Sequence, residues 1–151
     1  MSSHHARIRF QHSAGSFADK SFSRDHRWEF KGEQTLLASS APGYNGNPLA
    51  VDPEDAFTAA LSSCHMLTFL AVAAVKGFEV ESYEDDPVGT LDKNAEGRMS
   101  MVEVVLRPRV VFKGRQPTRE ELDGLHERAH KGCFIGNSIK STVRIEAQEV
   151  A

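Results

Sequence analysis

The chain has 151 residues, and its 18 basic and 21 acidic side chains give a formal net charge of −3. This length suits one domain that buries a core without metal or disulfide support, so we predict a single domain over residues 1–151. A nearly balanced charge provides no basic field, which argues against binding to nucleic acid or to anionic membrane surfaces.

The first ten residues, MSSHHARIRF, lack the apolar core of a signal peptide, so we expect a cytoplasmic protein. In a reducing cytoplasm the two cysteines, Cys64 and Cys133, are expected to be free or redox-active. A permanent structural disulfide is the less favoured interpretation.

The N-terminal third reads as short strands. Residues 6–12 alternate apolar and polar side chains, as a half-buried strand does, and residues 27–40 predict two strands joined near Lys31 and Gly32. A loop rich in Gly, Asn and Pro then covers residues 41–51.

A long apolar helix follows this loop. Asp52 is a suitable N-cap, Pro53 suits the first helical position, Glu54 adds negative charge at the positive end of the helix dipole, and Gly77 ends the helix. Residues 56–75 contain no Asp, Glu, Lys or Arg.

This apolar run is long enough to span a membrane, which needs roughly 20 apolar residues. Its polar side chains, its acidic flanks and the lack of Trp or Tyr at its ends argue against a membrane span. A helix that is apolar on nearly all sides is expected at the centre of a soluble fold or between two copies of one.

The second half predicts further strands and one more helix. Residues 78–86, 89–93 and 98–112 have the composition of long antiparallel strands, with Pro108 favouring an edge or a bulge. Residues 119–133 form the second predicted helix, and residues 141–150 the last strand. Thr118 is the predicted cap of that helix. The fold class is therefore α+β, with helices packed on antiparallel sheet.

The two cysteines differ in what their positions allow. A thiol attacks only as the thiolate, and a free cysteine with a pKa of about 8.5 is mostly protonated at neutral pH. Cys64 lies in mid-helix and cannot use the positive helix end, so it needs a nearby cation such as Arg. Cys133 falls in the last turn of its predicted helix, where partial negative charge disfavours a thiolate. Cys133 is better suited to resolve an oxidised sulfur than to attack first.

Three segments carry a resemblance to a known family. SRDHRW, DPEDAFTAALSSC and AHKGCFIGNS resemble, in order and separation, the three blocks of the OsmC/Ohr family of thiol-dependent hydroperoxide reductases. The resemblance implies antiparallel sheets around a long central apolar helix plus a second helix, in an intertwined homodimer. It also implies reduction of organic hydroperoxides without haem, flavin or metal.

By position in these blocks, the site residues that the resemblance implies are Arg24, Glu54, Cys64 and Cys133. Cys64 would attack the peroxide and become a sulfenic acid, and Cys133 would close a disulfide with it. Arg24 would orient the thiolate and the peroxide, held by a bidentate pair with Glu54. A small dithiol or a lipoylated protein is the implied reductant.

Helix geometry adds a constraint. Ten residues of α-helix rise about 15 Å, so Glu54 and Cys64 of one straight helix cannot share a site. Either the helix is broken or the other subunit supplies Glu54, and we favour the second.

Several alternatives remain. Arg27 competes with Arg24 for its role, and Phe134 stands where family members active on peroxides often have Pro. Trp28, Phe57 and Phe134 are candidates to line an apolar pocket for bulky organic peroxides.

Two other functions are open. A catalytically weak member of the fold would bind a small apolar or electrophilic molecule, with the cysteines as sensor or packing groups, and a third interpretation is a dimerisation module without a ligand. A zinc site using His130 and Cys133 with Cys64 or His65 is disfavoured, because the adjacent Cys64 and His65 point about 100° apart on a helix.

Overall fold

The computed structural model describes residues 1–148. The chain divides into two compact units, Met1–Ala56 and Phe57–Ala151, which we call the N-terminal and the C-terminal unit. The predicted single-domain organisation stays a prediction.

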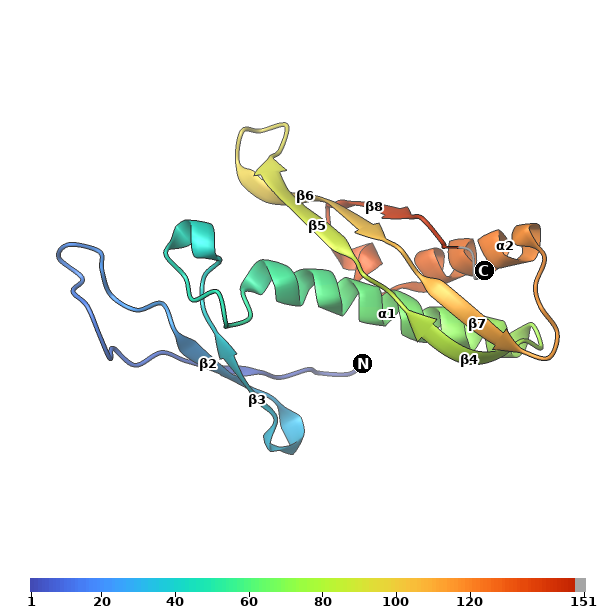
Figure 1. Cartoon of the computed structure of the whole chain (residues 1–151), viewed down its shortest axis with the longest axis horizontal. Helices are drawn as coiled ribbons and strands as arrows, with labels where there is room; N and C mark the ends of the chain where they lie inside the picture. The colour runs from blue at the N-terminus through green and yellow to red at the C-terminus, as the bar shows by residue number, and fades with distance from the viewer. Residues whose placement is uncertain (149–151) are drawn as a thin grey trace. The chain divides into compact units, whose positions relative to one another are not determined.

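The N-terminal unit is a three-stranded antiparallel meander. Strands β1 (Arg7–Arg9), β2 (His26–Glu29) and β3 (Thr35–Ala38) pair in that order, as predicted (Figure 1). Gly32, at a φ of 68°, makes the turn between β2 and β3. The first strand is shorter than the predicted 6–12, because the chain leaves the sheet at Phe10, whose ring meets that of Phe17.

The N-terminal unit buries very few side chains. Among its residues only Ala38, Ser39 and Asp52 are buried. Several large apolar side chains of the unit are exposed: Ile8, Phe10, Phe17, Phe30, Leu36, Leu37, Tyr44 and Leu49. The described chain therefore leaves most of this unit's apolar surface uncovered.

Helix α1 (Pro53–Val75) is continuous over its 23 residues. The Asp52 carboxylate accepts a hydrogen bond from the Asp55 amide at 2.8 Å, which confirms the predicted cap. Gly77 ends the helix with a φ of 76°, also as predicted. By length and composition alone α1 could cross a membrane, and only 28% of its apolar window is buried.

Two small sheets form in the C-terminal unit. Strand β4 (Glu79–Glu84) pairs antiparallel with β7 (Arg109–Lys113), and β5 (Val88–Lys93) pairs antiparallel with β6 (Met99–Leu106). Strand β8 (Thr142–Ile145) joins β6 in parallel, unlike the antiparallel arrangement expected throughout. A parallel pair needs a long crossover, and β7 with the second helix provides it.

Pro108 divides the predicted strand 98–112. It lies between β6 and β7, which belong to different sheets, and it is buried. Proline has no N–H to continue a ladder, so the strand breaks where an edge or bulge was predicted.

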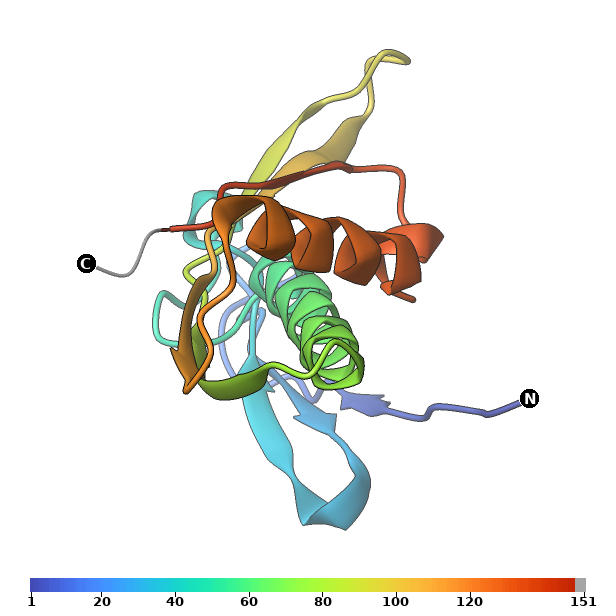
Figure 2. The same ribbon diagram turned by 90° about the vertical axis from the view of Figure 1, so that its right-hand side faces the viewer.

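Helix α2 (Arg119–Gly132) begins with a reciprocal cap. The Glu121 amide donates to Thr118 Oγ1 at 3.2 Å, and the Thr118 amide donates to the Glu121 carboxylate at 2.9 Å. Cys133 is the residue after the last turn, not within it as expected. Figure 2 shows α2 lying beside α1.

The core of the C-terminal unit forms on one side of α1. One buried cluster joins α1 to α2 and to the β4–β7 sheet: Phe69, Ala73, Phe78, Val110, Phe112, Leu125 and Ala129. A second cluster joins α1 to β6 and to the end of α2: Leu61, Val104, Leu106 and Cys133. These clusters fix α1, α2 and the sheets relative to one another.

A pair of buried histidines also joins the two helices. His65 Nε2 lies 3.1 Å from His126 Nδ1, and the remaining ring nitrogen of each has no hydrogen-bond partner within residues 1–148. Burial, together with the neighbouring His130, lowers the pKa of His65 to about 4. Burial, together with His65, lowers the pKa of His126 to about 4. Both rings are therefore neutral at pH 7.

The histidine pair predicts that the fold weakens in acid. Histidine in the unfolded chain has a pKa near 6.5. Below that pH the unfolded chain therefore binds protons at these two positions, while both rings of the folded chain stay neutral until the pH approaches 4. Stability from the pair is complete above pH 6.5 and is lost as the pH falls toward 4. Between pH 7.5 and 5 we expect a loss of about 2 kcal/mol of unfolding free energy per histidine, measured by urea denaturation.

The matched variants are His126→Gln and, as control, His5→Gln, which changes an exposed histidine. His126→Gln should flatten the pH dependence, and His5→Gln should leave it unchanged. An equally steep dependence in His126→Gln would show that other groups cause it.

Candidate thiol site

The structure brings the two cysteines together. Cys64 is half-buried on α1, and Cys133 follows α2 with only 1% of its surface exposed. Both are free thiols, and Cys64 packs against the buried cluster that contains Cys133. The sequence places them 69 positions apart, and the packing of α2 on α1 makes them neighbours.

Both sulfur atoms accept a hydrogen bond from a main-chain amide. The Ile135 amide donates to Cys64 Sγ at 3.5 Å, and the Gly136 amide donates to Cys133 Sγ at 3.3 Å. Both amides belong to the loop that follows α2.

The environment keeps Cys133 protonated. Burial raises the pKa of Cys133 to about 11, and Cys64 acts in the same direction, whereas the Gly136 and Ile135 amides oppose them. At neutral pH Cys133 is therefore a thiol, which agrees with the sequence argument that it is not the attacking group.

The surroundings of the two sulfurs are apolar. Phe57, Ile135 and Ile139 pack with the cluster of Leu61, Val104, Leu106 and Cys133. Phe57 thus packs in the same cluster as the thiols, and its predicted place in the wall of an apolar pocket stays a prediction. Phe134 is 81% exposed and lines no pocket there, because the chain turns its side chain outward directly after Cys133.

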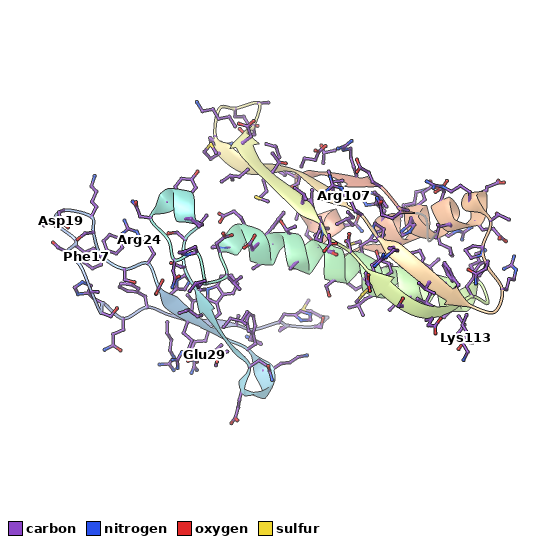
Figure 3. All side chains as sticks on the ribbon, viewed as in Figure 1. Phe17, Asp19, Arg24, Glu29, Arg107 and Lys113 are labelled. Atoms are coloured by element: carbon purple, nitrogen blue, oxygen red, sulfur yellow. The ribbon has the colours of Figure 1, made fainter. Side chains whose placement is uncertain are left out.

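Arg24 lies in the loop before β2, in the same segment as Phe17 and Asp19 (Figure 3). Its guanidinium donates to the carbonyls of Phe22 and Lys20, the latter at 2.9 Å, and lies 4.1 Å from the centroid of the Phe22 ring. The neighbouring Arg27 is exposed on β2, so Arg24 is the better-held of the two guanidinium groups.

Glu54 lies half-buried in the first turn of α1. Because α1 is unbroken from Pro53 to Val75, the broken-helix alternative is wrong. Glu54 and Cys64 of the same helix are separated by a rise of about 15 Å and cannot act on one substrate atom. Arg24 and Glu54 belong to the N-terminal unit, and the two cysteines belong to the C-terminal unit.

The zinc hypothesis gains no support. Within residues 1–148 no three His, Cys, Asp or Glu side chains are arranged to hold a metal ion. His65 is directed to His126 and not to the thiols.

Sequence reasoning missed two features near the thiols. One is the histidine pair. Its only indication in the sequence is that His126 lies next to the apolar Leu125 on α2. The other is the pair of amide donors at Ile135 and Gly136, which no residue type could have indicated.

Comparison with known proteins agrees with this architecture. The sequence matches the family described as OsmC-like protein over residues 45–148. The structure of an OsmC-like protein of unknown function from Vibrio cholerae superimposes with a TM-score of 0.92 and 47% identity, over 98% of this chain and 100% of that one.

More distant structures share the fold. An organic hydroperoxide resistance protein from Elizabethkingia anophelis has a TM-score of 0.69 at 17% identity, over 97% of this chain and 95% of that one. The organic hydroperoxide resistance protein OhrB of Bacillus subtilis has a TM-score of 0.67 at 17% identity, over 95% and 98%.

No curated protein matches the sequence at a significant level. The family match nevertheless covers well over half of the sequence and includes α1, α2 and both cysteines. The chain belongs to the OsmC-like protein family.

Proposed function

We propose that this protein reduces organic hydroperoxides, with Cys64 as the attacking thiol and Cys133 as the resolving thiol. The observation that carries the proposal is that a half-buried and a fully buried free thiol lie in one cluster, with both sulfurs accepting hydrogen bonds from amides of the same loop. Family membership and the fold shared with organic hydroperoxide resistance proteins support a peroxide-related role.

In each turnover the two cysteine thiols reduce one hydroperoxide, and one external dithiol regenerates them. The Cys64 thiolate attacks the distal peroxide oxygen, the O–O bond breaks, and the products are a Cys64 sulfenic acid and an alkoxide that is protonated to the alcohol. The Cys133 thiol displaces water from the sulfenic acid and forms the disulfide. An external dithiol, either small or a lipoyl group on a protein, then reduces the disulfide and is itself oxidised. The cytoplasm is the expected compartment, since it keeps such a disulfide transient.

Arg24 and Glu54 complete the proposed site. The Arg24 guanidinium would stabilise the thiolate and orient the peroxide, and Glu54 would hold Arg24 through a paired carboxylate. Since α1 is straight, Glu54 must come from a second copy of the chain if it is to act at Cys64.

Two surfaces support an obligate homodimer. One face of α1 carries Ala60, Ser63, Leu67, Ala71 and Ala74, spaced three and four residues apart, and all five are exposed in the single chain. Small uncharged side chains allow a second α1 to approach closely. The uncovered apolar side chains of the N-terminal unit likewise need cover that a second copy would provide.

A second candidate is a weak or inactive member of the fold that binds a small apolar or electrophilic molecule. It is favoured by the hydrogen bonds of Arg24 to carbonyls of its own loop, which occupy donors that a peroxide would otherwise use. Such a protein would be stabilised by its ligand while its thiols stay unchanged.

Thiol counting separates the two functions. Reduced protein treated with one equivalent of cumene hydroperoxide should lose both thiols and form an intramolecular disulfide, as measured by thiol titration and mass spectrometry. Cys64→Ser should not react, whereas Cys133→Ser should retain a sulfenic acid that dimedone traps. Unchanged thiols in the wild-type protein would favour the binding function.

Mixed dimers test whether the site is shared. Exchanging subunits between Glu54→Gln and Cys64→Ser protein makes half of the dimers mixed, and each mixed dimer regains one intact site only if Glu54 acts across the interface. We expect about one quarter of the wild-type activity, from two inactive parents. No recovery, with subunit exchange verified by native mass spectrometry, would exclude a role for Glu54 at the partner's Cys64.

A charge on the exposed face of α1 tests the dimer itself. Leu67, which is 61% exposed, should tolerate Glu in a monomer, but Leu67→Glu buries an unpaired carboxylate in the proposed interface. We expect a monomer in analytical ultracentrifugation, with peroxide turnover lost. Val88→Glu, at an exposed apolar position on β5, is the control and should remain a dimer. Full turnover in a monomeric Leu67→Glu protein would refute the shared site.

A further inference from the structure

The loop after α2 directs two successive main-chain amides at two different sulfurs. Ile135 N lies 3.5 Å from Cys64 Sγ, and Gly136 N lies 3.3 Å from Cys133 Sγ. The Ile135 amide also interacts with the Cys133 thiol, whose pKa it acts to lower. The loop therefore satisfies its own donors with the sulfur atoms.

This loop is held in place by its own hydrogen bonds. The Asn137 amide donates to the Cys133 carbonyl at 2.9 Å, and Asn137 Nδ2 donates to the Lys131 carbonyl at 3.0 Å. Ser138 Oγ donates to the Phe134 carbonyl at 2.7 Å. The Ile135 side chain packs into the apolar cluster around the thiols. The amides are thus fixed before any reaction and need not reorganise when charge develops.

Such fixed donors suit a sulfur that becomes negatively charged. Successive backbone N–H groups form anion-binding concavities, and a hydrogen bond to an ionised acceptor is about twice as strong as one to a neutral acceptor. The cluster against which Cys64 packs contains Leu61, Phe57 and Ile139, whose apolar side chains offer no compensation for charge. An N–H that stays unpaired would also be costly there.

We propose that the Ile135 amide is a catalytic main-chain donor that stabilises the Cys64 sulfur anion, and that the Gly136 amide holds Cys133 Sγ beside it for disulfide closure. The assignment of Cys64 as the attacking thiol rests on the proposed function. The amide donor is a component additional to Arg24 and Glu54, and it comes from the same chain as the sulfur it serves.

Gly136 lies directly against the resolving sulfur. A Cβ placed there would lie 3.4 Å from both Cβ and Sγ of Cys133 and 3.7 Å from Leu61 Cδ1, which are ordinary van der Waals distances.

The test removes one N–H at a time. Replacing Ile135 with its α-hydroxy acid, by nonsense suppression, exchanges the amide for an ester and keeps the side chain. Ile135→Pro is the second variant, since the φ of −65° at Ile135 matches that of proline. The matched control is Phe134→Pro, which removes the neighbouring N–H, and the extended Cys133 (ψ 112°) accepts a following proline.

The readout is the alkylation rate of Cys64 by iodoacetamide in a Cys133→Ala background, which reports thiolate without any peroxide. At about pH 7 the ester variant should react about tenfold more slowly than its parent, and Phe134→Pro within about twofold of it. At about pH 10, where thiols are ionised anyway, the rates should converge. A loop that had merely loosened would instead expose the sulfur and speed alkylation at both pH values.

The outcomes separate this inference from the proposed function. If the ester variant alkylates as fast as its parent at both pH values, the amide donor is wrong, whatever the peroxide activity. If the ester slows alkylation while wild-type thiols ignore hydroperoxides, the amide donor stands and the peroxidase proposal fails. An equal slowing in Phe134→Pro would overturn the assignment to Ile135.

Discussion

The packing of the α2 end against the middle of α1 is the constraint on which the site depends. Leu61 and Cys133 are buried in the same cluster, and His65 is hydrogen-bonded to His126 one position after Cys64 on α1. These contacts hold the loop after α2 against α1, and that loop carries Cys133 and the two amide donors. The site is thus a product of helix packing, since no short segment of the chain contains it.

The two faces of α1 differ in burial. One face buries Leu61, His65, Phe69 and Ala73 against the sheets and α2 of its own chain. The other face is also apolar but is exposed. The helix is therefore hydrophobic on nearly all sides, although only 28% of its most apolar 18-residue stretch is buried. In the proposed homodimer a second copy covers the exposed face, so both apolar faces of α1 would be buried in protein.

The features that could be predicted from the sequence are those that depend on contacts between residues close together in the chain. The Asp52 cap, the Thr118 capping box and the Gly77 stop act within one turn, so they can be read from neighbouring residues. The parallel β6–β8 pair, the outward Phe134 and the His65–His126 bond depend on contacts between distant segments. The two cysteines were identified because a family resemblance supplied that long-range information, which residue patterns alone lack.

The difference between the two thiols follows from their depth in one shared apolar environment. Cys64 is half-buried, so a small electrophile can reach it, whereas Cys133 is closed to solvent and kept protonated by burial. A neutral thiol adjacent to a sulfur anion adds no like charge, so the pair avoids the repulsion that two thiolates would suffer. In the proposed reaction the order of the two thiol steps therefore follows from this difference in burial and charge.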